Sequence, residues 1–196
     1  MMASAWQWTL AALLLVCLAS FGWAMQKFFL QPAGLTAGMR VIKVCGIAFG
    51  IIHLAAIIAT PDISTVRGLS GAVLYLSSVA LFWWAIRTST GKPLSAAFSP
   101  DLPTHLVAQG PYRIIRHPLY CAYLIFWVAG WVATGRMWLG PTILVMLVIY
   151  VVAAAEEERK FARSPLAEAY QQYRARTGLL FPNPVKLCTR SWETAA

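Results

Sequence analysis

Gly110-Pro-Tyr-Arg-Ile-Ile-Arg-His-Pro-Leu-Tyr120 is the stretch of this chain that decides the fold. It places two arginines, a histidine and two tyrosines directly before an apolar run from Leu119 to Gly135. A turn at Arg136 leads into a second apolar run, residues 137–155, which stops at the three glutamates 156–158. Each run is about long enough to cross a bilayer, and two crossings return the chain to the face it left. We therefore predict that the Arg-His-Pro stretch and the glutamates meet on one side of a membrane.

Composition places the whole chain among integral membrane proteins. Of its 196 residues, 59% are hydrophobic and 12% are charged, whereas soluble domains average about 45–50% and about 25%. The net charge of +9 is compatible with a nucleic-acid partner. Basic residues between hydrophobic spans usually mark the cytoplasmic face instead, so we expect no nucleic acid. The four cysteines have no paired spacing, so we predict neither a disulfide framework nor a metal site.

Three further apolar stretches precede the central one, and we predict a single all-α membrane domain with five transmembrane helices. The first three spans occupy residues 1–26, 44–60 and 68–86. The first span lacks a basic leader region and is too long for a signal peptide, so we expect it to be retained. Residues 87–117 form the one long polar connection, and long irregular loops are often functional. The remainder, residues 118–196, holds the hairpin of spans four and five and the C-terminal segment.

The segment after the glutamates differs in pattern from the spans. Residues 159–176 mix apolar and charged side chains at rough helical spacing, with Ser164-Pro165 as an interruption. A helix of this kind lies in the membrane interface with its apolar face toward the lipid. We predict a C-terminal amphipathic helix on the membrane surface, broken near Pro165.

The basic residues predict the orientation. With the N-terminus outside, 14 of the 16 Lys and Arg residues fall in inside segments, and only Arg67 and Arg136 fall outside. Because cytoplasmic loops carry an excess of Lys and Arg, this bias predicts that the N-terminus is outside and the C-terminus inside. The Arg-His-Pro stretch and the glutamates, and with them the active site, then face the cytoplasm.

The start of the fourth span is suited to binding an anionic group. Pro118 fits the first turn of a helix, because a proline there has no hydrogen bond to lose. The helix N-terminus, Arg116 and His117 together supply positive potential. Lipid head-group binding by the arginine and a plain capping role for the histidine are the alternatives. At the end of the fifth span, a carboxylate that faces the fourth span would meet a cationic ligand or Arg116, whereas one that faces water needs no partner.

These pieces carry a resemblance to a known family. From Thr104 to Pro182 the chain resembles the isoprenylcysteine carboxyl methyltransferase family of membrane methyltransferases, with their bacterial relatives and the phospholipid methyltransferases. The matching pieces are, in order, Leu106-Val107, Gly110-Pro-Tyr112, Arg116-His-Pro-Leu-Tyr120, Glu157-Glu158, Phe161, Tyr170, Tyr173, Arg176-Thr-Gly178 and Pro182. The N-terminal half matches only in being hydrophobic.

The resemblance implies an enzyme that binds S-adenosylmethionine in a cytoplasmic pocket and methylates a substrate with a lipid tail. Carried over by position, the cofactor-binding residues are Thr104, His105, Leu106, Val107, Tyr112, His117, Pro118, Leu119, Tyr120 and Glu157. Glu157 suits a positive group of the cofactor, and Tyr112 or Tyr120 can place an aromatic face near its sulfonium. We assign Arg116 and Glu158 to catalysis, with Glu158 as general base if the nucleophile is an amine or a thiol.

The expected substrate is a lipid-like or prenylated small molecule that is methylated at a carboxylate. Methylation of a phospholipid or another amine, or of a thiol, stays open, because Ala153 stands where the prenylcysteine enzymes have an arginine assigned to substrate. An NADPH-dependent membrane reductase of the sterol type has a similar C-terminal half, but the chain is short for one. A non-catalytic membrane scaffold would not need both the Arg-His-Pro and the glutamate elements. Beyond the substrate and membrane lipids, the sequence implies no protein partner.

Overall fold

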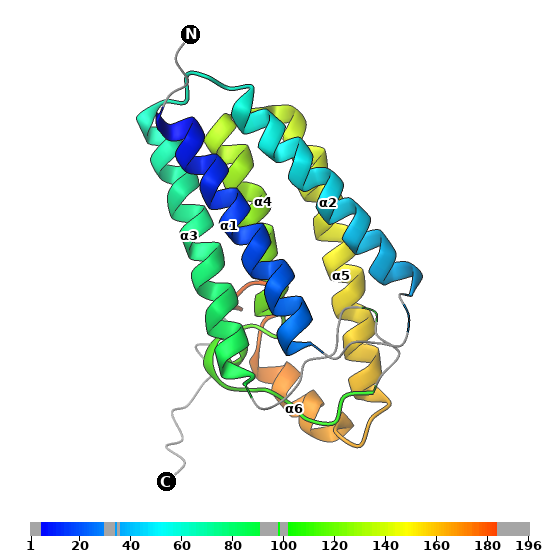
Figure 1. Ribbon diagram of the computed structural model, residues 1–196. Helices are drawn as coiled ribbons and strands as arrows, with labels where there is room; N and C mark the ends of the chain where they lie inside the picture. Colours follow the sequence, from blue (N-terminus) through cyan, green and yellow to red (C-terminus); the bar gives the residue numbers. More distant parts are fainter. Residues whose placement is uncertain (1–4, 30–33, 35, 91–97, 99–101, 184–196) are drawn as a thin grey trace.

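The computed structural model describes residues 5–29, 34, 36–90, 98 and 102–183 (Figure 1). Within these residues the fold is all-α, with isolated β-bridges and no named strand. The helices are α1 (Ala5–Phe28), α2 (Ala37–Ile58), α3 (Thr65–Thr88), α4 (Pro118–Thr134), α5 (Gly140–Ala162) and α6 (Ala167–Arg176). Two short 3₁₀ helices, Gly110–Arg113 and Met137–Leu139, precede α4 and α5. The all-α character that the sequence predicted is therefore confirmed for the described part of the chain.

Among the described residues, four helical segments are long and apolar enough to cross a membrane, namely α1, α2, α3 and residues 137–162. The 17 residues of α4 are also apolar, but they span only about 25 Å, less than the roughly 30 Å of a hydrocarbon core. The chain is an integral membrane protein. The fifth crossing remains a prediction, because α4 lies at the lower limit of spanning length. The predicted orientation is independent of helix length and also remains a prediction.

Two helix boundaries differ from the predicted ones. Helix α2 begins at Ala37 instead of residue 44, because the Thr36 side chain caps it by accepting a hydrogen bond from the Met39 amide at 3.3 Å. Helix α5 continues past the three glutamates to Ala162, since Glu, Arg, Lys and Ala all favour helix. Only α6 is a separate C-terminal helix, and the interruption lies at Pro165 as predicted.

Small residues bring α3 and α4 into the closest helix contact of the bundle. A Cβ atom added to Gly71 of α3 would lie 2.6 Å from the Cβ of Ala133 in α4. Farther along the same interface, the Ser78 hydroxyl donates a hydrogen bond to the Ala122 carbonyl at 2.7 Å. Small side chains and interhelical hydrogen bonds are the usual means by which membrane helices associate. These contacts hold α4, and the Arg-His-Pro stretch before it, on a rigid support.

The turn between α4 and α5 is fixed to the end of α2. Gly135 ends α4 in the left-handed region at φ 64°, a conformation that glycine adopts without steric cost. The Arg136 side chain then donates hydrogen bonds to the Thr60 hydroxyl at 3.2 Å and the Ala59 carbonyl at 3.1 Å. A cation at the end of α2 satisfies carbonyl groups that have no partner within the helix. The hairpin is thereby held at the end opposite to the glutamates.

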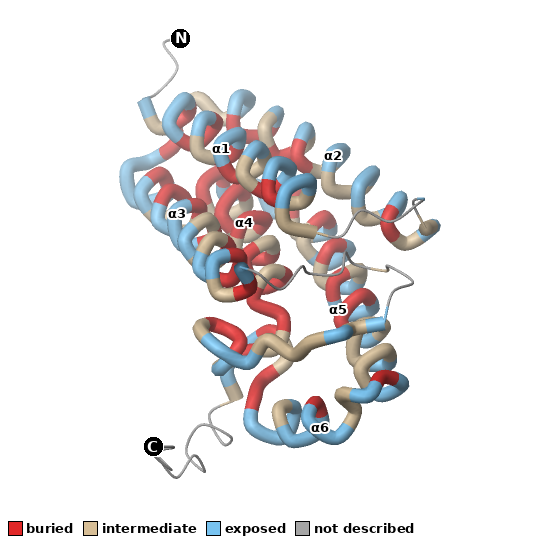
Figure 2. The backbone as a smooth tube through the Cα atoms, turned by 60° about the horizontal axis from the view of Figure 1, so that its bottom comes forward, coloured by how far each residue is buried: buried red, intermediate tan, exposed pale blue. Residues whose placement is uncertain are grey.

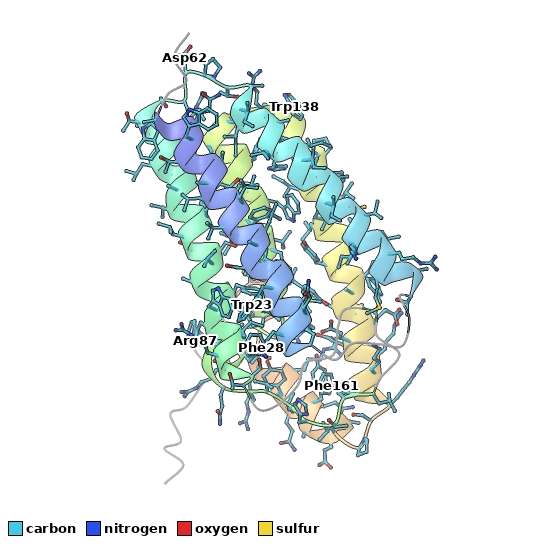
Figure 3. All side chains as sticks on the ribbon, in the orientation of Figure 1. Trp23, Phe28, Asp62, Arg87, Trp138 and Phe161 are labelled. Atoms are coloured by element: carbon cyan, nitrogen blue, oxygen red, sulfur yellow. The ribbon has the colours of Figure 1, made fainter. Side chains whose placement is uncertain are left out.

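The two ends of the bundle differ in character. Figure 3 shows Asp62 and Trp138 at one end, and Trp23, Phe28, Arg87 and Phe161 toward the other, where α6 lies. Figure 1 shows α2 and α5 drawing apart from α1 and α4 as they approach α6. Figure 2 shows buried backbone on the facing sides of the helices and exposed backbone on the outer sides of α1, α2 and α3. Large apolar side chains are exposed on these three helices, among them Trp8, Val44, Ile51 and Val73, as expected of helices that face lipid.

Candidate active site

A large cavity lies between α1, α2, α4 and α5 and reaches α6. Its volume is about 1060 Å³, at the upper end of the roughly 300–1000 Å³ that is usual for ligand sites. All ten residues assigned to cofactor binding line this cavity: Thr104, His105, Leu106, Val107, Tyr112, His117, Pro118, Leu119, Tyr120 and Glu157. Arg116 lines it too, whereas Glu158 does not. The structure thus brings together the scattered pieces of the motif.

Backbone pairing positions the Arg-His-Pro stretch. Ile115 and Gly178 form a parallel bridge, in which the Arg116 amide donates to the Gly178 carbonyl at 2.8 Å and the His117 amide donates to the Leu179 carbonyl at 3.2 Å. Helix α4 then starts with Pro118 in its first turn, as predicted. The C-terminal segment after α6 therefore holds the entrance to α4 in place.

The Arg116 guanidinium joins three parts of the chain. Its side chain is only 7% exposed, and its Nε atom lies 2.7 Å from the Glu158 carboxylate of α5. The same guanidinium donates to the Thr177 carbonyl at 2.6 Å. Arg174 of α6 adds a second cation 3.4 Å from Glu158. The pair therefore ties α5 and α6 to the Arg-His-Pro stretch, while the catalytic role assigned to both residues stays a prediction.

The three glutamates at the end of α5 face three directions, because successive helical residues lie about 100° apart. Glu156 pairs with Arg159 at the surface, and Glu158 pairs with Arg116. Glu157 points into the cavity, where it accepts a hydrogen bond from the Tyr120 hydroxyl. One of its oxygens also lies 3.3 Å from Nδ1 of His117. Glu157 is the one glutamate placed to meet a cation inside the cavity, among the residues that the structure describes.

Three rings form a column along the cavity wall. The His117 and Tyr120 rings stack at 5.5 Å with planes 15° apart, and the Tyr120 and Tyr150 rings stack at 5.4 Å with planes 9° apart. The Trp127 indole then donates a hydrogen bond to the Tyr150 hydroxyl at 3.2 Å. The column leads from the polar entrance at α4 toward the apolar interior between the helices.

Two carboxylates flank the imidazole of His117. Burial alone lowers its pKa, but the nearby carboxylates of Glu157, 3.3 Å from Nδ1, and Glu158, 3.7 Å from Nε2, raise the pKa further than burial lowers it. The net result is a pKa above the ordinary value of 6.5. A charged imidazole here offsets the carboxylate of Glu157 and keeps its position fixed.

The tyrosines of the motif and of α6 cover the polar end of the cavity. The Tyr173 hydroxyl donates to the Tyr112 carbonyl at 2.7 Å, and Tyr170 stacks on Phe161 of α5 at 4.3 Å. The Tyr112 hydroxyl is buried with no hydrogen-bond partner. Burial and the neighbouring charge of Glu157 raise the pKa of Tyr112, so its hydroxyl stays protonated and free to donate to a ligand. Tyr170 and Tyr173 of α6 thus line the cavity, and the predicted place of this helix on the membrane surface stays a prediction.

The first four predicted cofactor residues lie on the extended segment between the loop and the Arg-His-Pro stretch. Thr104 and His105 are hydrogen-bonded to each other, with Oγ1 and Nδ1 3.0 Å apart, and Leu106 and Val107 are partly buried beside them. Residues 91–97 and 99–101 of the predicted loop lie outside the described residues. The described part of the loop forms one rim of the cavity.

Sequence reasoning missed the aromatic residues that line the apolar part of the cavity. Tyr123 and Trp127 of α4 and Tyr150 of α5 all line it, yet the sequence motifs predicted none of the three as site residues. A signal was present for one of them, because Tyr150 precedes Glu157 by seven residues, about two helical turns, and therefore shares its face. Within the described residues, no group of His, Cys, Asp or Glu side chains is placed to hold a metal ion.

Comparisons with known proteins bear on this site. A family model described as phospholipid methyltransferase matches residues 66–171, from the start of α3 into α6. A curated relative, the methanethiol S-methyltransferase of Pseudomonas sp. (strain GM41), is 28% identical over 165 residues. The alignment covers 77% of this chain and 61% of that relative, so the chain spans less than two thirds of the relative's length.

Proposed function

Because the chain belongs to the phospholipid methyltransferase family, we propose that it is an integral membrane enzyme that transfers a methyl group from S-adenosylmethionine to the thiol of an apolar substrate. The observation that carries the proposal is one continuous cavity, whose polar end is lined by the ten motif residues and whose other end is lined by apolar side chains of the spans. The family resemblance that the sequence motifs indicated is confirmed.

The residues at the polar end fit S-adenosylmethionine. The Glu157 carboxylate supports a positively charged group, and the buried Tyr112 hydroxyl is an unused donor for an acceptor atom. The first turn of α4, where Leu119 and Tyr120 have amide groups without partners inside the helix, suits a carboxylate. Flat rings of Tyr120 and His117 offer stacking surfaces. When bound, the cofactor supplies a methyl group from its positively charged sulfur, and the rest of the cofactor leaves as a neutral thioether.

The chain's own residues orient the two reactants and exclude water from the site. One hydrogen bond from Tyr120 and contact with His117 fix the Glu157 carboxylate before any ligand binds. Tyr170 and Tyr173 of α6 line the cavity from the solvent side. Holding two reactants in line within a closed site accounts for much of the rate that such enzymes achieve. The protein's contribution is therefore mainly positioning and desolvation.

Arg116 and Glu158 act in this proposal by positioning. Both side chains are largely buried and satisfied by each other and by the C-terminal backbone. Glu158 does not line the cavity, so its assignment as a general base rests on the sequence alone. The substrate reacts as its thiolate after its proton has passed to solvent water, and the thiolate sulfur then displaces the methyl group from the sulfonium. The proposed reaction therefore does not depend on Glu158 as a proton acceptor.

The apolar end of the cavity supports a substrate with a hydrocarbon chain. It extends between α1 and α2 past Leu18, Ile47 and Ile51. Each buried CH₂ group contributes about 0.8 kcal/mol, so an acyl or prenyl chain would be held mainly by burial there. A thiol is the least polar of the candidate nucleophiles and suits this surrounding. The activity named for the Pseudomonas relative supports the same nucleophile.

A carboxylate nucleophile is the second candidate. Ala153 is fully buried in α5, so the position where the prenylcysteine enzymes have their substrate arginine offers no charge. Lys43 of α2 lines the cavity and is a cation able to meet a substrate carboxylate. This lysine, together with the family resemblance, keeps methyl-ester formation as the alternative.

The polar end of the cavity is proposed to face the cytoplasm. The basic residues that gather at this end, Arg116, Lys160 and Arg174 among them, support it through the charge bias of membrane proteins. Fusions of a topology reporter to residue 196 and to the Arg136 turn should report opposite sides. The same side for both would overturn the orientation.

The proposed reaction is tested with labelled methyl transfer. Purified protein in lipid nanodiscs is given S-adenosylmethionine with a labelled methyl group and dodecanethiol, dodecanoic acid or dodecylamine. Label should appear in dodecyl methyl sulfide ahead of the ester or the methylamine. In parallel, calorimetry should show binding of S-adenosylhomocysteine and none of NADPH. Binding of NADPH alone would establish the reductase instead, and binding of neither would support a scaffold.

A further inference from the structure

One polar atom lies within the apolar end of the cavity with its hydrogen unused. The Tyr150 side chain is 4% exposed and lines the cavity together with apolar residues such as Phe126 and Met146. A hydroxyl in such surroundings is costly unless its hydrogen-bonding capacity is met. The position of this hydroxyl therefore needs an explanation.

The hydrogen bond that Tyr150 makes leaves its own hydrogen available. The indole Nε1 of Trp127 is a donor only, and it donates to the Tyr150 hydroxyl oxygen at 3.2 Å. Among the residues that the structure describes, no acceptor receives the Tyr150 hydrogen. Trp127 thus fixes the oxygen, and a ligand in the cavity is the natural acceptor of the hydrogen.

Tyr150 also lies at the boundary between the two ends of the cavity. Its ring stacks on Tyr120 at 5.4 Å, and the Tyr120 hydroxyl bonds to Glu157. On its other side lies Trp127, one of the residues that line the apolar end. A group held at Tyr150 is therefore next to the residues proposed to hold the cofactor and still within reach of the apolar end.

We infer that the Tyr150 hydroxyl is the donor that holds the nucleophilic atom of the substrate, and that it selects apolar molecules ending in a hydrogen-bond acceptor such as a thiolate. The inference rests on the proposed function and deepens it. A hydrogen bond to the charged form favours that form, so Tyr150 also assists ionisation of a bound thiol. Tyr150 lies two helical turns before Glu157, and it supplies the substrate contact that Ala153 cannot make.

Tyr123 is the rival for this role. Its ring lies 5.7 Å from that of Tyr150 and also lines the cavity, but no hydrogen bond among the described residues fixes its hydroxyl. Tyr75 of α3 offers a matched control, because its hydroxyl is fully buried without a partner and lies outside the cavity. Replacing each tyrosine by phenylalanine removes one oxygen from three different places.

The test measures dodecanethiol methylation by the wild type and by the variants Tyr150→Phe, Tyr123→Phe, Trp127→Phe and Tyr75→Phe. A hydrogen bond to a charged group corresponds to a loss of roughly ten- to a hundredfold, which we expect in kcat/KM for Tyr150→Phe. Its affinity for S-adenosylhomocysteine should stay within about twofold of the wild type, which also shows that it is folded. Trp127→Phe keeps the Tyr150 hydroxyl and should lose less kcat/KM than Tyr150→Phe. Tyr75→Phe should match the wild type.

The pH profile separates a substrate contact from a packing role. The pH at which kcat rises, as the bound thiol ionises, should be about one unit higher in Tyr150→Phe than in the wild type. This shift is the equivalent of a tenfold loss in the bound thiolate. If the wild type is active and Tyr150→Phe has the same rate and the same pH profile, the inference is overturned and the proposed function stands. A larger loss of kcat/KM in Tyr123→Phe than in Tyr150→Phe would have the same meaning. A wild type that methylates no nucleophile would overturn the proposed function, and this inference with it.

Discussion

Replacement of Glu157 by glutamine removes the carboxylate that faces the cavity while keeping the size of the side chain. Glu157 bonds to Tyr120 and lies 3.3 Å from His117, and it lines the cavity where its neighbours Glu156 and Glu158 do not. A hydrogen bond between a carboxylate and a cationic ligand contributes roughly 1.5–3 kcal/mol. Since about 1.4 kcal/mol is a factor of ten, Glu157→Gln should weaken binding of the cofactor about ten- to a hundredfold.

The assay is calorimetric titration of S-adenosylhomocysteine into three single variants in the same detergent. Glu156→Gln breaks only a surface pair with Arg159, and such pairs contribute about 0–1 kcal/mol, so its affinity should stay near that of the wild type. Glu158→Gln should lower the thermal stability of the protein, because it leaves the buried guanidinium of Arg116 without its carboxylate.

The ranking of the three variants decides the matter. Equal and small losses of affinity at all three positions would mean that the glutamates are only a solvated helix end. A dominant loss of affinity in Glu156→Gln would refute the side-chain directions on which the site is built. A loss in Glu158→Gln that persists at temperatures where the variant is fully folded would move the cofactor contact by one residue.

Three further results are expected. Arg116→Ala should lower the free energy of unfolding by roughly 3 kcal/mol, because it leaves Glu158 partly buried without its closest cation; a denaturant titration that matches the wild type would contradict this. The raised pKa of His117 means that its charged form contributes stability that is complete below about pH 6.5 and is lost as the pH rises through the raised value; the melting temperature between pH 5.5 and 9 should fall in the wild type and fall less in His117→Asn. Gly71→Leu should destabilise the protein by about 1–3 kcal/mol, because its Cβ would lie 2.6 Å from that of Ala133; an unchanged melting curve would mean that α3 and α4 are not packed this closely.

Much of the site was predictable because its residues are close in sequence to strong helix signals. Pro118 marks the start of α4 and the run of glutamates marks the end of the apolar part of α5, so the hairpin and its two polar ends follow from hydrophobicity and length. The directions of the three glutamates follow from the helical repeat. These local rules do not need knowledge of how the helices pack.

What could not be predicted depends on contacts between distant segments. The bridge between Ile115 and Gly178, and the Arg116 side chain that bonds to the Thr177 carbonyl, join residues more than sixty positions apart. The inward direction of α6 also follows from packing, because Tyr170 finds Phe161 as a partner, whereas its pattern alone indicates a helix on a lipid surface. One miss has a local cause instead, because helix-forming residues carry α5 on to Ala162, which hydrophobicity alone does not reveal.

The central claim is that one cavity holds the cofactor at its polar end and the chain of the substrate at its apolar end. The most direct measurement is kcat/KM for labelled methyl transfer to a series of straight-chain thiols from methanethiol to hexadecanethiol. At about 0.8 kcal/mol per buried CH₂, kcat/KM should rise about fourfold with each added carbon until the apolar end is filled, and then level off. A series that is flat, or that is highest for methanethiol, would contradict the account.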